Sequence, residues 1–214
     1  MSAPAEPIAS QPAEIDRPVA REKMVLPVLA REVFSAIPEI GDDMCARPTA
    51  ESCPDFLAGL LSSATPEEAI TFCAYVLPPS ASVAWGHRCL QARPSGQTAI
   101  DQTLESLIGD WVAQGGQDGS REILRREILE IAEPIRPRSP AVWIALALGW
   151  SSGSISAPDL PPLLAPSFAT PRAVNAGVLG LLARCDLAER SDTLGEFVRL
   201  GRRIAAAIAA GREI

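Results

Sequence analysis

The amino-acid sequence predicts an all-α protein: a single compact bundle of about eight or nine helices with a proline-rich extended arm. Three pairs, Thr65-Pro66, Ser139-Pro140 and Thr170-Pro171, each precede an apolar, alanine-rich run. A Ser or Thr side chain accepts the free N–H groups of a first helical turn, and proline at the next position has no N–H to leave unpaired. Aromatic residues make up only 5% of a chain that is 47% hydrophobic. This aliphatic composition favours close-packed helices over sheets.

The length of 214 residues fits one domain preceded by a tail. Residues 1–23 carry four prolines among Ala, Ser, Glu and Gln, and such a segment buries too little apolar surface to order itself. We therefore expect a disordered tail over 1–23 and a single helical domain over 24–214.

In the N-terminal half, apolar residues at helical spacing predict four helices, over 24–37, 56–61, 66–77 and 80–92. An acidic loop over 38–54 separates the first two. The third has the strongest local signal, because Thr65 and Glu68 have the spacing of a capping box. Pro78-Pro79 ends that helix.

In the C-terminal half, the same spacing predicts helices over 100–111, 120–131, 140–150, 171–185 and 193–210. Two stretches, Ser80–Leu90 and Ser139–Leu148, are loosely alike, which permits a helix-pair repeat. The segment 151–169 is too apolar for a solvated linker and too rich in proline for a helix. We expect it to lie as an extended arm across the helices with its leucines buried.

Charge and cysteine content exclude several classes of function. The net charge is −7, which opposes binding of nucleic acid. The five cysteines include no C-x-x-C unit, so neither a zinc site nor a thioredoxin-like motif is indicated. There is no basic, apolar secretory signal and no apolar run of membrane-spanning length. We expect a cytoplasmic protein without membrane insertion, metal or cofactor.

Three features could carry chemistry, and each has an ordinary structural interpretation that we favour. His87 is the only histidine, and its neighbour two residues on, Cys89, points to a different helix face. The loop carboxylates Glu39, Asp42 and Asp43 lack the spacing of a calcium-binding loop. The glycine-rich segment 115–119 lacks the lysine of a phosphate-binding loop. We assign no catalytic, cofactor-binding or metal-binding residue.

Two segments could instead bind a protein. Arg199, Arg202 and Arg203 form a basic patch opposite the apolar face of the last helix. They are either a solvated face near a helix C-terminus or a docking surface for an acidic partner. Leu160, Leu163 and Leu164 lie between the prolines of the arm, which either packs on its own domain or docks a partner.

The chain resembles an uncharacterised bacterial all-helical domain family found in secretion-system gene neighbourhoods, particularly type VI. The residues that carry the resemblance extend over most of 25–210: Thr65-Pro66-Glu67-Glu68-Ala69, Pro78–Leu90 with Trp85, Ala141–Gly153 with Trp143 and Trp150, and Pro161-Pro162 leading to Ala173-Val174. The resemblance implies an accessory or scaffold role and assigns no catalytic residue.

The leading hypothesis is a non-enzymatic helical protein that binds another protein, with an adaptor or scaffold at a secretion apparatus as its specific form. The alternative is a small-molecule-binding protein or enzyme with a pocket between helices, lined by Trp85, Trp143 and Trp150. A third hypothesis is an immunity or regulatory protein whose acidic loop, with Asp42 and Asp43, covers a basic target. The sequence does not specify the partner or the oligomeric state.

Overall fold

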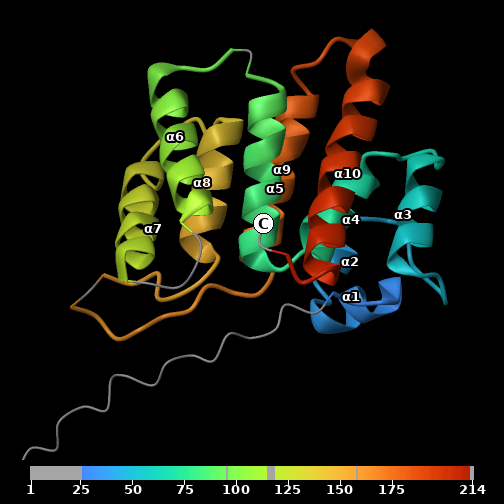
Figure 1. Cartoon of the computed structure of the whole chain (residues 1–214), viewed down its shortest axis with the longest axis horizontal. Coiled ribbons are helices and arrows are strands. Elements are labelled where there is room, and N and C mark those ends of the chain that lie inside the picture. The colour runs from blue at the N-terminus through green and yellow to red at the C-terminus, as the bar shows by residue number, and fades with distance from the viewer. Residues whose placement is uncertain (1–25, 95, 115–118, 158, 213–214) are drawn as a thin grey trace, which may run out of the picture.

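The computed structural model describes residues 26–94, 96–114, 119–157 and 159–212, and this part of the chain is all-α (Figure 1). In chain order its helices are α1 (Ala30–Ala36), α2 (Ile40–Asp43), α3 (Cys53–Leu61), α4 (Glu68–Val76), α5 (Pro79–Ala92), α6 (Ala99–Ala113), α7 (Gly119–Ala132), α8 (Pro140–Trp150), α9 (Ala169–Leu182) and α10 (Leu187–Ala209). The described residues form no strand beyond two isolated bridges. The predicted fold class is confirmed, whereas the tail predicted over 1–23 lies outside the described residues.

Helix α8 lies at the centre of the bundle and contacts α5, α6, α7 and α9. Nine of its eleven residues are buried, and Trp143 and Trp150 are the two that remain partly exposed. A helix that is apolar all round can only be stable when neighbours cover every face. Figure 1 shows α6 and α7 on one side of α8, and α10 running along α5 on the other. Helices α1 to α3 complete the far end beside α4.

Glycines allow the central helices to approach one another closely. A Cβ atom on Gly86 of α5 would lie 2.5 Å from Ile144 Cδ1, and one on Gly177 of α9 would lie 2.7 Å from the same atom. On α8 itself, a Cβ on Gly149 would lie 2.6 Å from Leu129 Cδ1. The core is therefore built from aliphatic side chains inserted against bare backbone, as the low aromatic content suggested.

Of the three predicted Ser/Thr-Pro caps, only Ser139 is confirmed. Its hydroxyl accepts the N–H of Val142 at 3.2 Å, at the start of α8. Thr170 instead lies inside α9, where its buried hydroxyl donates to the carbonyl of Ala147 at 3.4 Å. The signal therefore locates helix starts to within a few residues, while tertiary contacts decide what the hydroxyl binds.

The capping box predicted at Thr65 and Glu68 is wrong. Helix α4 begins at Glu68, three residues after Thr65, and no side chain caps it. The Glu68 carboxylate accepts the N–H groups of Cys45 and Ala46, at 2.6 and 3.0 Å. Glu68 therefore ties α4 to the loop after α2 and does not bind back to its own helix.

Several helix boundaries also differ from the prediction. The first helix begins at Ala30, because the chain before it pairs with the end of the segment predicted as the acidic loop: Cys53 N donates to Val28 O at 3.0 Å. The acidic loop itself contains the short helix α2. Helix α10 begins at Leu187 and not at residue 193, and with 23 residues it is the longest of the described helices. No helix in the described residues has both the length and the apolar character needed to cross a bilayer.

Candidate functional site

The segment predicted as a proline-rich arm, described over 151–157 and 159–168, lies between α8 and α9 and folds back on itself (Figure 1). Ser154 and Leu164 form an antiparallel bridge, and Ile155 N donates to Leu163 O at 2.8 Å. The Ser154 hydroxyl accepts the N–H of Leu163 at 3.0 Å, and the Ser156 hydroxyl donates to Pro161 O at 2.8 Å. Both sides of the loop are therefore fixed to each other by backbone and hydroxyl groups.

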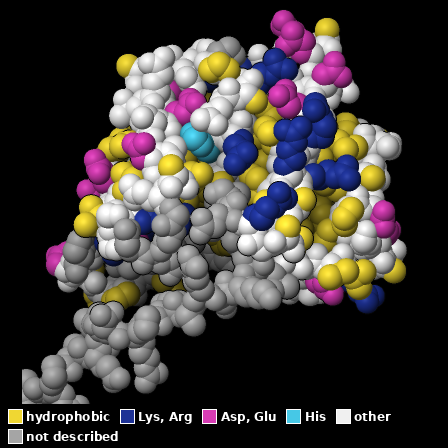
Figure 2. Space-filling model, viewed as in Figure 1, with side chains coloured by type: hydrophobic (Ala, Val, Ile, Leu, Met, Phe, Trp, Pro, Cys, Tyr) yellow, Lys and Arg dark blue, Asp and Glu magenta, His cyan; other side chains and the backbone are white. Residues whose placement is uncertain are grey.

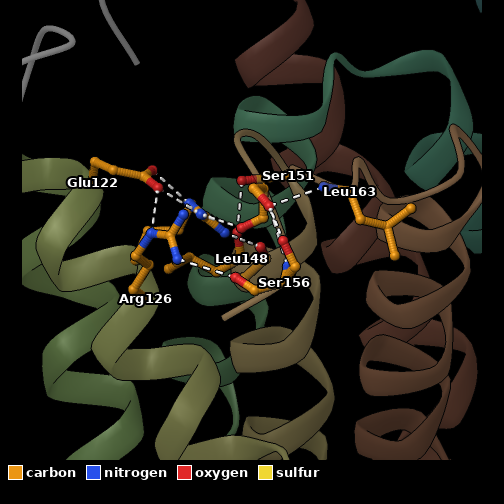
Figure 3. A network of polar contacts seen from close by, with 9 residues as sticks. Glu122, Arg126, Leu148, Ser151, Ser156 and Leu163 are labelled. Atoms are coloured by element: carbon orange, nitrogen blue, oxygen red, sulfur yellow. Dashed lines mark hydrogen bonds and ion pairs between the residues drawn. The ribbon is translucent and has the colours of Figure 1, made fainter. Parts of the chain in front are cut away.

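A buried arginine of α7, Arg125, anchors this arm to the bundle within the polar network around Glu122 and Ser156 (Figure 3). The Arg125 side chain is only 1% exposed. Its Nε and Nη2 donate to the two carboxylate oxygens of Glu122, each at 2.6 Å. Nη2 also donates to Ser154 O at 2.9 Å, and Nη1 donates to the carbonyl of Gly149 at the end of α8. One side chain thus joins α7, α8 and the arm, and its hydrogen bonds hold the pKa of Glu122 below the usual range.

Two further features show how closely the arm fits this arginine. Arg126 donates to Glu122 at 3.0 Å and to Ser156 O at 3.3 Å, adding a second link from α7. Gly153 has φ +63°, and a Cβ there would lie 2.9 Å from Arg125 Nη2. Glycine is therefore required at this position both by its backbone conformation and by the approach of the guanidinium.

The arm's leucines are exposed, and the prediction that they are buried is wrong. Leu160, Leu163 and Leu164 are 57%, 59% and 71% exposed. Figure 3 shows the Leu163 side chain pointing away from the polar network. The reason is that the arm attaches to α7 through the Ser154 and Ser156 carbonyls, while its hydroxyl groups bond within the arm, so the attachment uses none of the leucine side chains. Phe168, at the end of the arm, is the large apolar side chain that packs against the core.

The arginines predicted as a basic patch occupy the solvent face of α10. Arg199, Arg202 and Arg203 are exposed, opposite the buried residues Leu194, Phe197, Val198, Ile204 and Ile208. Arg88 of α5 is also exposed, and α5 packs directly against α10. Figure 2 shows basic side chains gathered along α10 and beside it. We call Arg88, Arg199, Arg202 and Arg203 the arginine face.

His87 lines a hollow of about 350 Å³ between α5 and α6, together with Gln91, Gln102, Glu105, Ser106 and Gly109. The ring is 6% exposed and hydrogen-bonds to the Glu105 backbone, and burial lowers its pKa. A Cβ on Gly109 would lie 3.2 Å from the ring, so His87 fills the space that this glycine leaves. Cys89 is fully buried, and burial raises its pKa well above the usual value. The two side chains therefore form no nucleophile–base pair.

The tryptophans predicted to line a pocket have other surroundings. Trp85 is fully buried, and its indole N–H donates to Phe197 O at 2.8 Å, joining α5 to α10. Trp143 packs under the Arg138 guanidinium at 4.7 Å. A second hollow, of about 540 Å³, lies between α6 and α7 beside Ile123 and Leu124. None of the three tryptophans lines it or the His87 hollow.

The acidic loop holds the fold together through Asp43. Arg172 Nε donates to both oxygens of Asp43, at 2.9 and 3.0 Å, and the Tyr75 hydroxyl donates to the same carboxylate. Burial and this hydrogen bond raise the pKa of Tyr75. Within the described residues, no group of three or more His, Cys, Asp or Glu side chains is arranged to hold a metal ion. Asp43 is therefore engaged within the chain, whereas Asp42 is exposed.

The anchoring role of Arg125 was not predicted from the sequence. Glu122 and Arg126 lie four residues apart on α7, a spacing typical of helical ion pairs, and their charged groups are 3.0 Å apart. Arg125, however, lies three residues before Ile128 and seven before Ala132, both of which are buried. An arginine in register with an apolar stripe is the signal that could have identified it.

Comparison with known proteins gives one match. A family model described as a family of unknown function (DUF6931) matches residues 56–205, from α3 to α10. No curated protein and no solved structure matches the chain. The matched range includes the arm, the Arg125 network and the whole arginine face.

Proposed function

The chain belongs to this family of unknown function, DUF6931, and we propose that it is a non-enzymatic protein-binding module. The observation that supports the proposal is the arm, which presents three exposed leucines on a loop fixed by its own hydrogen bonds and by Arg125. Exposed apolar side chains on a preorganised loop lose little conformational freedom on binding, so more of the gain from burying them appears as affinity.

The site residues carry little that suggests catalysis. Among the described residues, His87 packs between two helices and Cys89 is buried, so the two groups best suited to acid–base or nucleophilic chemistry serve the core. The proposed partner is another protein, and we place the module at a bacterial secretion apparatus in the cytoplasm. This finer assignment rests on the sequence resemblance alone.

Replacing the arm's leucines tests the proposal. A variant with Leu160→Ser, Leu163→Ser and Leu164→Ser should retain the helical content and unfolding midpoint of the native protein, because these side chains make few contacts. Affinity capture from the native cells, quantified by mass spectrometry, should show at least about a tenfold loss of the captured protein, as expected for removing a hydrophobic hot spot.

Leu187→Ser is the matched control, since Leu187 is 88% exposed and lies at the start of α10, away from the arm in the sequence. The control should capture the same protein as the native chain. Equal capture by the arm variant, or recovery of the native chain alone as a monomer, would contradict the proposal.

A further inference from the structure

The arginine face carries positive charge that nothing in the described chain neutralises. Arg88, Arg199, Arg202 and Arg203 form no ion pair with any described residue, although the chain has a net charge of −7. Two acidic side chains of α10 are engaged elsewhere: Glu189 and Glu196 lie 3.4 and 3.9 Å from the guanidinium of Arg93. The arginine face therefore carries positive charges that are unpaired among the described residues, whereas Glu189 and Glu196 of α10 pair with Arg93 at the end of α5.

Neither the helix dipole nor an ion pair with a described residue explains Arg199, Arg202 and Arg203 on α10. Cations stabilise a helix dipole in its last turn, but the last turn of α10, which ends at Ala209, contains no basic residue. Arg199 and Arg203 are four residues apart and Arg199 and Arg202 are three apart, so their like charges face each other. This repulsion is unfavourable for an isolated helix, and only Glu196, three residues before Arg199, partly offsets it.

The surroundings of the arginines suit the approach of another chain. Beyond Arg203, the solvent side of α10 carries the exposed alanines Ala206 and Ala209, whose small side chains leave the helix surface flat. On α5, the exposed Arg88 lies three residues after Trp85, whose indole N–H joins this helix to α10 at Phe197 O. Arginine forms paired hydrogen bonds with carboxylates, and a fork of this kind binds planar oxyanions well.

We propose that the arginine face binds an acidic segment of a partner protein through carboxylates spaced along one side of that segment. The proposal rests on the protein-binding role proposed above but uses a different surface from the arm. The two can therefore fail separately. Charge complementarity favours a short acidic stretch of protein, which can contact the arginines alone. A nucleic acid is a longer polyanion and would also meet the negative charge of the rest of the chain, whose net charge is −7.

Fluorescence anisotropy on the full chain tests the proposal with defined probes. The acidic probe is a labelled peptide of about 20 residues, a length that can form a helix, with Glu and Asp on one face. Its counterpart carries Lys at the same positions, and a single-stranded oligonucleotide of similar charge is the third probe. The acidic peptide should bind at least about tenfold more tightly than both others, and its binding should weaken as salt is raised from about 50 to 300 mM.

Charge reversal identifies the surface. The double variant Arg199→Glu and Arg203→Glu should lower affinity for the acidic peptide by at least about tenfold. Arg31→Glu is the matched control, because Arg31 of α1 is also exposed and lacks an ion pair among the described residues. It should bind as the native chain does. Circular dichroism should show that both variants fold.

Three results would overturn the proposal. They are equal affinity of the double variant for the acidic peptide, tighter binding of the oligonucleotide than of the peptide, and self-association in sedimentation that disappears in the double variant. The last would identify a second copy of this chain as the occupant. If the acidic peptide does not bind but the native chain still captures a protein through the arm's leucines, the proposal for the arginine face fails and the proposed function stands.

Discussion

Two groups of arginines show opposite relationships to the rest of the molecule. Arg125 is 1% exposed, and its donors reach Glu122, Gly149 O and Ser154 O. The arginine face is exposed and has no ion pair among the described residues. A buried cation must be paired and hydrogen-bonded to persist, whereas an exposed one is solvated wherever it stands. Arg125 therefore stabilises the fold, whereas the arginine face is available to a binding partner.

The largest expected effect is that of Arg125→Met. The substitution fills most of the volume but leaves Gly149 O and Ser154 O without their donor, while Glu122, which is 42% exposed, can return to water. We expect a loss of about 2–4 kcal/mol in the free energy of unfolding, measured by urea denaturation.

Arg126→Met is the control for that measurement, because the Arg126 side chain is 31% exposed and should contribute no more than about 1 kcal/mol. Amide hydrogen exchange gives a second measurement: Ile155 and Leu163, whose N–H groups bond within the arm, should exchange faster in Arg125→Met. An equal effect of the two substitutions would mean that burial does not distinguish these arginines.

The sequence predicts the fold class well because helix starts and apolar spacing are local properties. The helix around Trp143 and Leu146 is recognisable from its apolar run, and α8 begins at Pro140 as predicted. The arm was predicted as extended because proline excludes helix, which is also a local property. Its orientation was not predictable in the same way. Leu163 faces solvent because Ser154 and Arg125, distant in the sequence, fix the other side of the arm.

For the arginine face, too, one part could be predicted from local sequence and another depends on how the helices pack. The solvent position of Arg199, Arg202 and Arg203 follows from helical spacing and was predicted. Their lack of partners, and the addition of Arg88 from another helix, depend on how α5 and α10 pack. Composition cannot supply that information, because the same nineteen basic residues could have been paired throughout.

Ser139→Ala and Thr65→Ala compare a hydrogen-bonded hydroxyl with a solvated one, since both residues belong to the Ser/Thr-Pro pairs that predicted helix starts. Ser139 caps α8 and also donates to Asp101, a carboxylate that is 3% exposed and accepts Thr98 N at 2.9 Å. Its loss should lower stability by about 1–2 kcal/mol, measured by thermal or urea unfolding. Thr65 is exposed and caps nothing, so its loss should have an effect below about 0.5 kcal/mol. Similar effects at both sites would show that the network around Asp101 adds nothing.

His87→Gln examines a side chain that is buried, like Arg125, but can lose its charge by releasing a proton. Burial lowers the pKa of His87 from its usual 6.5, so the unfolded chain binds the proton more readily than the folded chain. The native protein should therefore lose stability as pH falls below 6.5, with the loss levelling off below the folded-state pKa. The difference in unfolding free energy between the native protein and His87→Gln should shift against the native protein over this range. A difference that is independent of pH would contradict the burial of a neutral imidazole.

Of the two groups of arginines, the arginine face should show the smaller effect on stability, and there Arg199→Glu should raise it. The new carboxylate lies three and four residues before Arg202 and Arg203, so repulsion is replaced by attraction in the favoured orientation, partly offset by Glu196 three residues earlier. The gain should be about 0.5 kcal/mol at low salt and vanish near 1 M NaCl, where the Debye length is about 3 Å. Arg199→Gln, which removes the repulsion and also the weaker attraction to Glu196 without adding a negative charge, should gain about half as much. A loss of stability in both variants would mean that Arg199 has a stabilising partner inside the chain, and the arginine face would then resemble Arg125 and not a surface open to a partner.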